Sequence, residues 1–378
     1  MKRVISVVSN NLLTDQRVHK TAETLLLAGF AVHIIGCNKN NTPKPVRNYT
    51  LYRFKVWFKK KVWFYAEFNI KLFFILLFSK TDFVLANDLD SLPAAFLASK
   101  IRKFNLVYDS HELFTEVPEL KTGSFSKSAW LFVEKLILPK LTRCYTVSQS
   151  IANYYNTVYR TAFGVVPNFP DIKEPIKQNA LQKNEIYTEI EAFKTAGKKI
   201  VLYQGAVNVG RGIEACIEAV KLLPNTVFVI IGTGDIWHRL KHEIKEKNIE
   251  KIVYMPGAVA FEHLPAITLL ADCGVALLEN SSLSYQYALP NRVFDYTFAN
   301  IPFMVSDLPE MAALVNNYKI ATICRQFTPE YVADKINELL TNTALRKQLI
   351  DQMQLAKQLL AWEVNEPMLL KYFETGLE

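Results

Sequence analysis

Short apolar runs alternate with longer amphipathic stretches along most of the chain. Apolar runs of this length suit buried parallel strands, and the stretches between them repeat apolar residues at helical spacing. In the first part of the chain we predict strands over residues 4–9, 30–36, 51–56, 83–87, 106–109, 144–148 and 163–167. Helices are predicted between them, for example over 17–28, 92–101 and 129–139. This alternation predicts an α/β fold with a doubly wound parallel sheet.

The pattern stops at 169–198, where Pro170, Pro175 and a Lys/Gln/Glu/Asn-rich tract predict an interdomain connection. It then restarts, with strands predicted over 199–203, 226–231, 252–255, 275–278, 302–306 and 321–324. The last stretch, 329–378, has a helical pattern with a predicted break near 362–367. The sequence therefore predicts two Rossmann-like domains, 1–168 and 199–359, that face each other across a cleft.

Composition supports a globular protein of two or three domains, since half of the 378 residues are hydrophobic and about a fifth are charged. The cysteines are odd in number and far apart, which favours reduced, buried thiols and excludes a disulfide framework or a zinc site. They are Cys37, Cys144, Cys216, Cys273 and Cys324. The first residues read as a strand and not as a signal peptide, so we expect a cytoplasmic protein.

Charge is unevenly distributed. The net charge is +8, and residues 1–80 hold 14 basic and 3 acidic residues, whereas the remainder holds 30 basic and 33 acidic ones. A basic first domain predicts an anionic partner, such as phosphate groups or a lipid surface. Nucleic acid is not favoured, because no stretch resembles a nucleic-acid reading module.

Residues 54–78 are rich in aromatic and basic side chains. The uninterrupted apolar run, 72–78, is far below the roughly 20 residues that a membrane-spanning helix needs. One interpretation is a helix that faces the core and has a solvated basic flank. The other is an interfacial surface in which aromatic rings meet lipid headgroups and Lys59, Lys60 and Lys61 meet anionic lipid. Both interpretations remain open at this point.

Residues 285–306 predict a loop, a helix and a buried strand in close succession. Pro290 suits the first helical position, and Asn300 ends the helical pattern before the apolar run 301–305. A helix N-terminus behind a strand has unpaired N–H groups and a positive dipole end, which suits a diphosphate. Asp295 is placed to accept hydrogen bonds from a ribose diol.

This stretch resembles the donor-site segment of the retaining GT-B glycosyltransferases of family 4, in the variant written P-N-K-x-F-E-Y-x-x-x-x-x-P. The resemblance covers nearly the whole chain, and its specific part is 201–310. It implies a GT-B fold whose second domain binds a nucleoside-diphosphate sugar and whose terminal helix, about 360–378, joins the first domain. It implies transfer of the sugar, with retention and without a metal or other cofactor, to a glycan or lipid-linked acceptor in cell-envelope polysaccharide synthesis. The implied donor residues in this segment are Pro290, Asn291, Arg292, Asp295 and Tyr287.

A glycine-rich turn, 203–214, follows the strand that opens the second domain. Its glycines, among them Gly205, permit close approach of a ligand to the backbone, and Arg211 supplies a permanent cation. By itself the turn could equally be structural, with a solvated arginine. The resembled family grips the donor diphosphate with two basic residues here. Arg211 stands at the second of these positions, and Ala206 replaces the first.

The family also has a glutamate eight residues before the position of Asp295, and this chain has Tyr287 there. Because that glutamate is associated with the donor sugar, its replacement leaves the identity of the sugar open. Glu279 follows the preceding strand and either compensates or is a loop charge. A further turn, 231–235, contains a Gly-x-Gly that predicts tight turn geometry.

Ionisable residues follow several strands of the first domain. His111 aligns with a family histidine that faces the transferred sugar, so we predict that it contacts a sugar hydroxyl; an ordinary loop histidine is the alternative. Asp109 is predicted to be structural. Asp88-Leu-Asp90 spells a D-x-D, but its position before a helix predicts N-capping by Asp90 and no metal site.

Three residues are predicted to lie on the acceptor side: Asp88, Asn10 and Arg17. Arg17 either reaches the cleft or lies on a solvated helix face, and Asp15 is expected to cap that helix. Other functions remain open: a nucleotide-sugar epimerase of the same fold, a nicotinamide-dependent oxidoreductase, or a non-catalytic sugar-nucleotide-binding protein. The oxidoreductase is disfavoured because no Gly-x-Gly-x-x-Gly follows the first strand.

Overall fold

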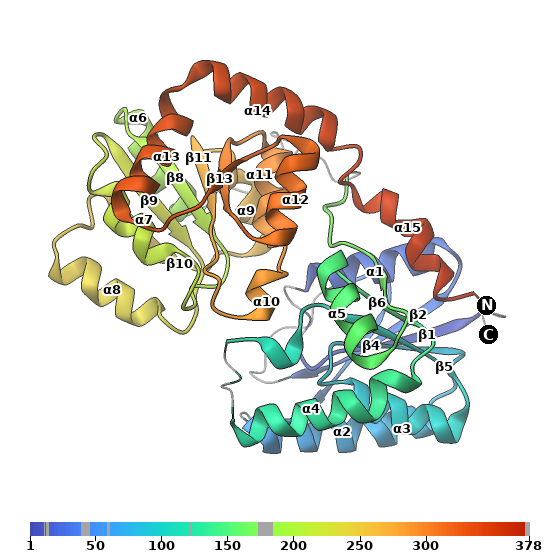
Figure 1. The fold of residues 1–378 in the computed structure, drawn as a ribbon. Helices are drawn as coiled ribbons and strands as arrows, with labels where there is room; N and C mark the ends of the chain where they lie inside the picture. Colours follow the sequence, from blue (N-terminus) through green and yellow to red (C-terminus); the bar gives the residue numbers. More distant parts are fainter. Residues whose placement is uncertain are drawn as a thin grey trace. The chain divides into compact units, whose positions relative to one another are not determined.

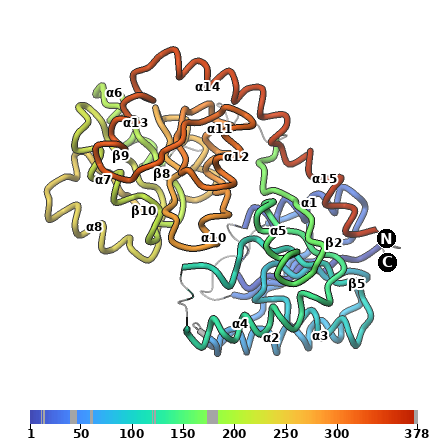
Figure 2. The backbone as a smooth tube through the Cα atoms, in the orientation of Figure 1, coloured from blue at the N-terminus to red at the C-terminus, as the bar shows by residue number. Residues whose placement is uncertain are grey.

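The structure is a computed structural model that describes residues 1–10, 12, 15–38, 46–58, 61–118, 120, 123–172 and 184–374. The chain forms two compact units (Figures 1 and 2). Unit 1 comprises Met1–Asn168, Ser282–Ser284 and Trp362–Glu378, and unit 2 comprises Phe169–Ser281 and Tyr285–Ala361.

Unit 1 is built on a seven-stranded parallel sheet. Its strands are β1 (Arg3–Val7), β2 (Ala31–Asn38), β3 (Thr50–Lys55), β4 (Phe83–Asn87), β5 (Asn105–Ser110), β6 (Cys144–Thr146) and β7 (Gly164–Val165). Their order in the sheet is β3-β2-β1-β4-β5-β6-β7. The direction of winding reverses between β1 and β4, which pair directly through Val4 and Phe83. In doubly wound sheets, ligands bind at the carboxyl ends of the strands that flank this reversal.

Helices cover both faces of this sheet. They are α1 (Gln16–Leu27), α2 (Lys61–Phe78), α3 (Leu92–Arg102), α4 (Phe125–Ile137), α5 (Gln149–Tyr159) and α15 (Trp362–Lys371). Figure 1 shows α1 and α15 over one face and α2, α3 and α4 over the other. The C-terminal helix α15 is fixed in unit 1 by Trp362, whose indole N–H donates to Thr24 Oγ1 at 2.9 Å.

Unit 2 repeats the same topology with six parallel strands. They are β8 (Lys199–Gln204), β9 (Thr226–Ile231), β10 (Val253–Gly257), β11 (Cys273–Ala276), β12 (Phe303–Ser306) and β13 (Thr322–Cys324), in the order β10-β9-β8-β11-β12-β13. The winding reverses between β8 and β11. The helices of this part of the chain are α6 (Glu185–Thr195), α7 (Ile213–Val220), α8 (Trp237–Glu246), α9 (Leu264–Thr268), α10 (Leu283–Gln286), α11 (Asn291–Ala299), α12 (Pro309–Tyr318), α13 (Pro329–Thr341) and α14 (Thr343–Ala356).

Each predicted strand has a counterpart in these two sheets, so the predicted class, two Rossmann-like α/β domains, is confirmed. Two local predictions are wrong. The tract 169–198 is not only a connection, because it includes α6, whose Tyr187 and Ile190 are buried in the core of unit 2. The predicted break at 362–367 is instead the helix α15, and the chain leaves α14 after Ala356. Pro367 lies inside this helix, and Trp362, its first residue, is buried.

All five cysteines are free and buried, as predicted. Among the described residues, no helix combines the length and the apolar character needed to cross a membrane.

Candidate functional site

In unit 1, the Asn10 side chain follows β1 and forms hydrogen bonds with Leu12 and Asp15. Its side-chain Oδ1 accepts a hydrogen bond from the Leu12 N–H at 2.8 Å, and its Nδ2 donates to Asp15 Oδ2 at 2.7 Å. Asp15 in turn caps α1 by accepting from the Val18 N–H at 3.1 Å, which confirms the predicted cap. Asn10 therefore lies at the carboxyl end of β1, beside the reversal in strand order, and its contact with an acceptor stays a prediction.

Arg17 is buried and does not lie on a solvated helix face. Its guanidinium is buried and donates twice to the Asp109 carboxylate, from Nε and Nη2, each at 2.8 Å. A third bond joins Nη1 to the Val166 carbonyl at 2.9 Å. The Arg17 side chain points inward from the first turn of α1. This orientation is stabilised because the buried Asp109 carboxylate needs a paired cation. Arg17 therefore positions Asp109, the solvated helix face is wrong, and a contact of Arg17 with an acceptor stays a prediction.

His111 lies between two carboxylates at the carboxyl ends of β4 and β5. Its Nδ1 is 3.4 Å from Asp88 Oδ2 and its Nε2 is 3.4 Å from Asp109 Oδ2. The backbone N–H of His111 also donates to Asp88 Oδ1 at 2.8 Å. A continuous charged row thus runs from Arg17 through Asp109 and His111 to Asp88. About a fifth of the His111 side chain is exposed, so one part of the ring remains accessible.

The burial and mutual interactions of these charged residues shift the pKa values of His111, Asp88 and Asp109. Burial acts to lower the pKa of His111, but Asp88 and Asp109 outweigh burial and raise that pKa to about 10. Burial raises the pKa of Asp88 to about 7, partly offset by His111. Burial also acts to raise the pKa of Asp109, yet Arg17 and His111 hold it below its ordinary value. At neutral pH His111 is an imidazolium, which can donate a hydrogen bond to a hydroxyl oxygen but cannot accept one.

The two carboxylates of the D-x-D bind different partners. Asp88 has a left-handed backbone conformation, with φ of 60°, and its side chain faces His111. Asp90 accepts a hydrogen bond from Ser9 Oγ at 2.5 Å. The N-cap position of α3 belongs to Ser91, so the predicted capping by Asp90 is wrong. A contact of Asp88 with an acceptor stays a prediction.

In unit 2, two glycine turns pack against each other at the carboxyl ends of β8 and β9. Gly205 and Gly232 have φ values of 132° and 140°, a conformation that residues with a Cβ rarely adopt. A Cβ on Gly232 would lie 1.9 Å from the Gly205 carbonyl oxygen. The chain therefore requires glycine at Gly232, and Gly205 presents bare backbone beside the reversal in strand order.

Arg211 lies in a tight turn immediately before α7. Its neighbours Gly210 and Gly212 both have positive φ, and Gly212 is the N-cap residue of α7. The guanidinium carbon of Arg211 lies 5.3 Å from the centre of the Tyr285 ring, a cation–π contact. The Tyr285 hydroxyl donates to the Val209 carbonyl at 3.2 Å, which fixes the ring. The sequence patterns assigned no role to Tyr285, although it lies in the donor segment.

The helix of the donor segment, α11, begins one residue later than predicted. Pro290 is its N-cap residue, with φ of −63° and ψ of 138°, and it provides no side-chain cap for the first turn. Asn291 is exposed at the first helical position. Asn300 ends the helix in a left-handed conformation, as predicted.

Arg292 is buried directly behind Gly205. Its guanidinium carbon lies 4.6 Å from the centre of the Tyr203 ring, and Nη2 donates to the Leu277 carbonyl at 3.2 Å. Nη1 lies 3.3 Å from the point where a Cβ on Gly205 would be. Arg292 therefore places positive charge against the Gly205 backbone, while its own side chain is only 4% exposed.

Asp295 is held by Gln204, a residue that the sequence patterns did not single out. Gln204 Nε2 donates to Asp295 Oδ2 at 2.7 Å, and Gln204 Oε1 accepts from Thr268 Oγ1 at 2.8 Å. Gln204 is the last residue of β8 and immediately precedes Gly205. This position in the sequence could have identified Gln204 as a site residue. The amide fixes one carboxylate oxygen of Asp295 and so orients the half-buried side chain.

The residues that replace the family's glutamate are placed less tightly. Tyr287 is half-buried in the turn between α10 and α11. Glu279 is exposed, and its backbone N–H donates to the Gly210 carbonyl at 2.8 Å, which links the loop after β11 to the Arg211 turn. Their roles toward a donor sugar remain predictions.

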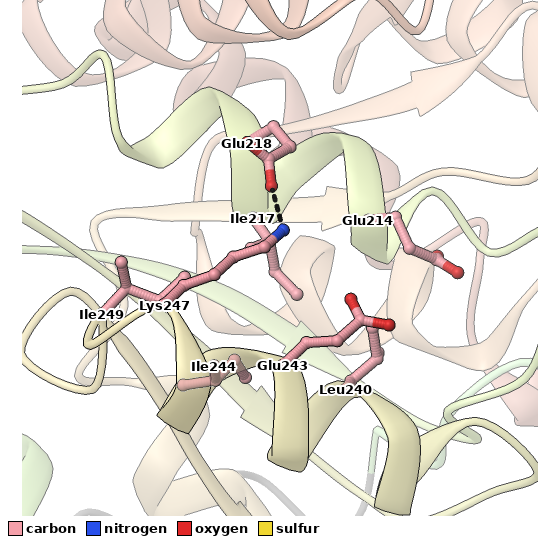
Figure 3. A pocket seen from close by; sticks show the side chains of 8 residues that line it. All are labelled: Glu214, Ile217, Glu218, Leu240, Glu243, Ile244, Lys247 and Ile249. Atoms are coloured by element: carbon pink, nitrogen blue, oxygen red, sulfur yellow. Dashed lines mark hydrogen bonds and ion pairs between the residues drawn. The ribbon is translucent and has the colours of Figure 1, made fainter.

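A groove between α7 and α8 is a separate feature of unit 2 (Figure 3). It encloses about 190 Å³, below the roughly 300 Å³ at which ligand pockets begin. Lys247 pairs with Glu218 in this groove, and its other two carboxylates, Glu214 and Glu243, pair with Arg239. None of the predicted donor residues lines it, so we do not assign it to the donor.

Two family models match the chain. The model of the glycosyl transferases group 1 matches residues 188–355, and that of Glycosyltransferase Family 4 matches residues 15–174. The architecture described above is that of the GT-B class. The chain belongs to the GT-B glycosyltransferases of group 1. None of the curated proteins matches it significantly in sequence.

Solved structures agree with this fold over the whole chain. Sucrose-phosphate synthase from Thermosynechococcus elongatus is 15% identical, with 99% of this chain and 98% of that chain covered and a TM-score of 0.78. Anabaena HepE in complex with UDP-glucose is 13% identical, with 99% of each chain covered and a TM-score of 0.77. WaaG, a glycosyltransferase involved in lipopolysaccharide biosynthesis, is 16% identical, with 99% and 100% covered and a TM-score of 0.72.

Proposed function

We propose that this glycosyltransferase moves a sugar from a nucleoside-diphosphate sugar to a glycan or lipid-linked acceptor, with retention of anomeric configuration. The donor binds to unit 2 at the carboxyl end of β8. One observation carries this proposal: the bare Gly205 backbone, the N-terminal half of α11 and the Gln204–Asp295 pair lie together at that edge. The similarity to HepE, which was solved with UDP-glucose, supports a uridine diphosphate donor as the first to be tested.

The donor's diphosphate is assigned to Arg211 and the first turn of α11. Pro290 brings no side-chain cap to this turn, and the positive end of the helix dipole favours an anion there. The Tyr285 ring positions the Arg211 guanidinium, which neutralises charge as the diphosphate leaves. This assignment requires no metal ion, and Asp88 and Asp90 are left to their own partners in unit 1.

Asp295 is assigned to the ribose of the donor. Its carboxylate can accept both diol hydrogens, and Gln204 fixes its orientation. His111 is assigned to the transferred sugar, next to which the accessible part of its ring places the positive charge of the imidazolium. Asp88 and Asn10, at the carboxyl ends of β4 and β1, are assigned to the acceptor side. The similarity to WaaG, a glycosyltransferase involved in lipopolysaccharide biosynthesis, supports a role in cell-envelope glycan synthesis. Association with the inner face of the membrane is part of the same proposal.

Thermal unfolding with a panel of nucleoside diphosphates and their sugars tests donor binding. A ligand at about 100 times its Kd stabilises the native state by about 2.7 kcal/mol, which raises Tm by several degrees. We expect Arg211→Ala to abolish the shift given by the bare diphosphate. Arg239→Ala is the matched control, since Arg239 is an exposed arginine of unit 2 that pairs with Glu214 and Glu243. An unchanged shift in Arg211→Ala would remove Arg211 from the site.

Incubation of the identified donor with and without candidate acceptors tests the reaction. Transfer requires both substrates, whereas an epimerase would convert the donor sugar alone and a binding protein would leave it unchanged. The anomeric configuration of the product, read by NMR, tests retention. Activity that survives a chelator would support the metal-independent assignment.

A further inference from the structure

The outward face of α2 is apolar along its whole length. The residues that face the core recur every four positions: Phe64, Phe68, Leu72 and Leu76. The outward residues, two positions away, are also apolar and are exposed: Val62, Ala66, Ile70, Phe74 and Phe78. Phe74 is 53% exposed and Phe78 80%. α2 is thus apolar on two opposite sides, and the described part of the chain covers only one of them.

The helices α3 and α4 extend this surface. Figure 1 shows α2, α3 and α4 side by side on the same face of the unit 1 sheet, and α3 contacts both of the others. The rings of Tyr65 on α2 and Trp130 on α4 meet edge to face at 5.2 Å. The exposed apolar residues of α3 and α4 are Leu97, Ile101, Phe125, Phe132 and Leu136. We call the outward surface of these three helices the α2–α4 face.

The segment before α2 adds two exposed aromatic rings in an ordered position. Trp57 is 80% exposed and Phe58 is 51% exposed. Glu67 accepts hydrogen bonds from both of their backbone N–H groups, and Lys71 Nζ lies 4.2 Å from the centre of the Trp57 ring. Large exposed apolar patches of this kind mark interaction surfaces.

The charge of the α2–α4 face is of one sign. The three helices contain only two acidic residues, Glu67 and Glu134. Glu134 is buried, and the Glu67 carboxylate is 9% exposed and forms an ion pair with Lys71. Exposed basic residues frame the apolar ones: Lys100, Arg102 and Lys135. A second copy of the same surface would bring like charges together, whereas an anionic surface complements it.

We propose that the α2–α4 face docks on the surface of an anionic phospholipid bilayer. The aromatic and aliphatic side chains enter the headgroup region, and the basic side chains meet lipid phosphates. The helices lie in the plane of the surface. The core-facing interpretation of residues 54–78 is confirmed for one side of α2, and this proposal assigns the other side to the interface. The side chains of Lys59, Lys60 and Lys61 lie outside the described residues, so the charge argument rests on α3 and α4.

Flotation of the full chain with vesicles tests this proposal without a donor or an acceptor. We expect binding to vesicles that contain phosphatidylglycerol, weaker binding to phosphatidylcholine alone, and release at high salt. Ile70→Gln, Phe74→Gln and Phe78→Gln together should weaken binding by at least about 100-fold, because three large side chains leave the lipid. The matched control replaces three exposed leucines elsewhere: Leu27→Gln, Leu355→Gln and Leu359→Gln, which should bind as the wild type does.

A second variant tests the charges. Each Lys or Arg near an anionic surface is worth about 1 kcal/mol, so Lys100→Gln, Arg102→Gln and Lys135→Gln together should weaken binding to phosphatidylglycerol vesicles about 100-fold. The control Lys245→Gln, Lys251→Gln and Lys347→Gln removes three exposed charges of unit 2 and should have little effect. Since every substituted side chain is exposed, the variants should keep the wild-type Tm.

Three outcomes would overturn the proposal. One is a wild-type protein that does not float with anionic vesicles. Another is an equal loss of binding in the variants and in their controls. The third is a wild-type dimer, seen by size-exclusion chromatography, that the Ile70, Phe74 and Phe78 variant converts to monomer while neither protein binds lipid. Failure of donor binding in unit 2 would leave this proposal untouched, because flotation does not depend on the nucleotide.

Discussion

The carboxyl ends of the two sheets have the same topology and different construction. In unit 1 the edge beside the reversal in strand order is made of paired charges: Arg17, Asp109, His111 and Asp88. In unit 2 the corresponding edge is made of glycine turns, with Arg292 and Gln204 behind them. The surface at the edge of the unit 1 sheet is therefore formed by side chains, whereas the surface at the edge of the unit 2 sheet is formed by backbone.

This difference suits different ligands. Backbone amides and an arginine can surround a diphosphate closely only where side chains are absent. A protonated histidine between carboxylates presents polar and charged side chains at the edge, which suits hydroxyl groups of a sugar. The same fold can thus bind a charged group, such as a diphosphate, and a neutral group, such as a sugar, because different residues lie at equivalent edges of its sheets. Four predictions test this comparison, from the largest expected effect to the smallest.

Arg17→Met should destabilise unit 1 by about 3–5 kcal/mol, because it leaves the buried Asp109 carboxylate without its paired cation. Urea unfolding followed by circular dichroism measures the loss. Arg239→Met, which breaks two exposed ion pairs in unit 2, should cost at most about 1 kcal/mol. Equal effects of the two substitutions would contradict the view that unit 1 depends on buried charge.

Gly232→Ala should destabilise unit 2 by at least about 2 kcal/mol, because the new Cβ meets the Gly205 carbonyl in a backbone conformation that alanine rarely adopts. The displaced Gly205 should also weaken binding of a nucleoside diphosphate. Gly29→Ala is the control: Gly29 has φ of 83°, but no atom lies within 4 Å of the position that a Cβ would occupy there, so only the backbone strain of about 1 kcal/mol remains. Thermal unfolding with and without nucleotide separates the two effects.

Gln204→Leu should reduce affinity for a nucleoside diphosphate about 10-fold while Arg211 remains in place, because Asp295 loses the amide that orients it. Isothermal titration calorimetry with the diphosphate and with the free base distinguishes a local loss of affinity from unfolding of the variant. Deoxyribose analogues should be less sensitive to the substitution than ribose ones. Equal losses for both kinds of analogue would show that Asp295 does not contact the ribose.

The pH dependence of stability should report the state of His111. Its pKa in the folded protein is about 10, above its ordinary value of 6.5, so its stabilising effect is complete below about pH 6.5 and is lost as the pH rises toward 10. Between pH 9 and pH 10, Tm of the wild type should therefore fall more steeply than Tm of His111→Gln, by the equivalent of about 1 kcal/mol. Parallel curves for the two proteins would show that the carboxylates do not raise the pKa of His111.

Local patterns in the sequence determined a large part of this structure. Strand β4 is bounded by Phe83 and Asn87 as predicted, because a buried parallel strand needs a continuous apolar run. Asp15 caps the N-terminus of α1 and Asn300 ends α11, both as predicted, because capping depends on one residue and the adjacent turn. The glycines near Arg211 could be identified because positive φ angles demand them.

Only the tertiary structure decided which distant residues meet. Arg17 and Asp109 are separated by 92 positions, and nothing in their local patterns indicates that α1 and the end of β5 enclose them together. Gln204 and Asp295, 91 positions apart, pair only because α11 packs beside β8. The outward apolar stripe of α2 likewise became distinct from its core stripe only when the sheet covered one side. Periodicity records a residue's immediate neighbours, whereas burial and long-range pairing depend on how whole elements pack.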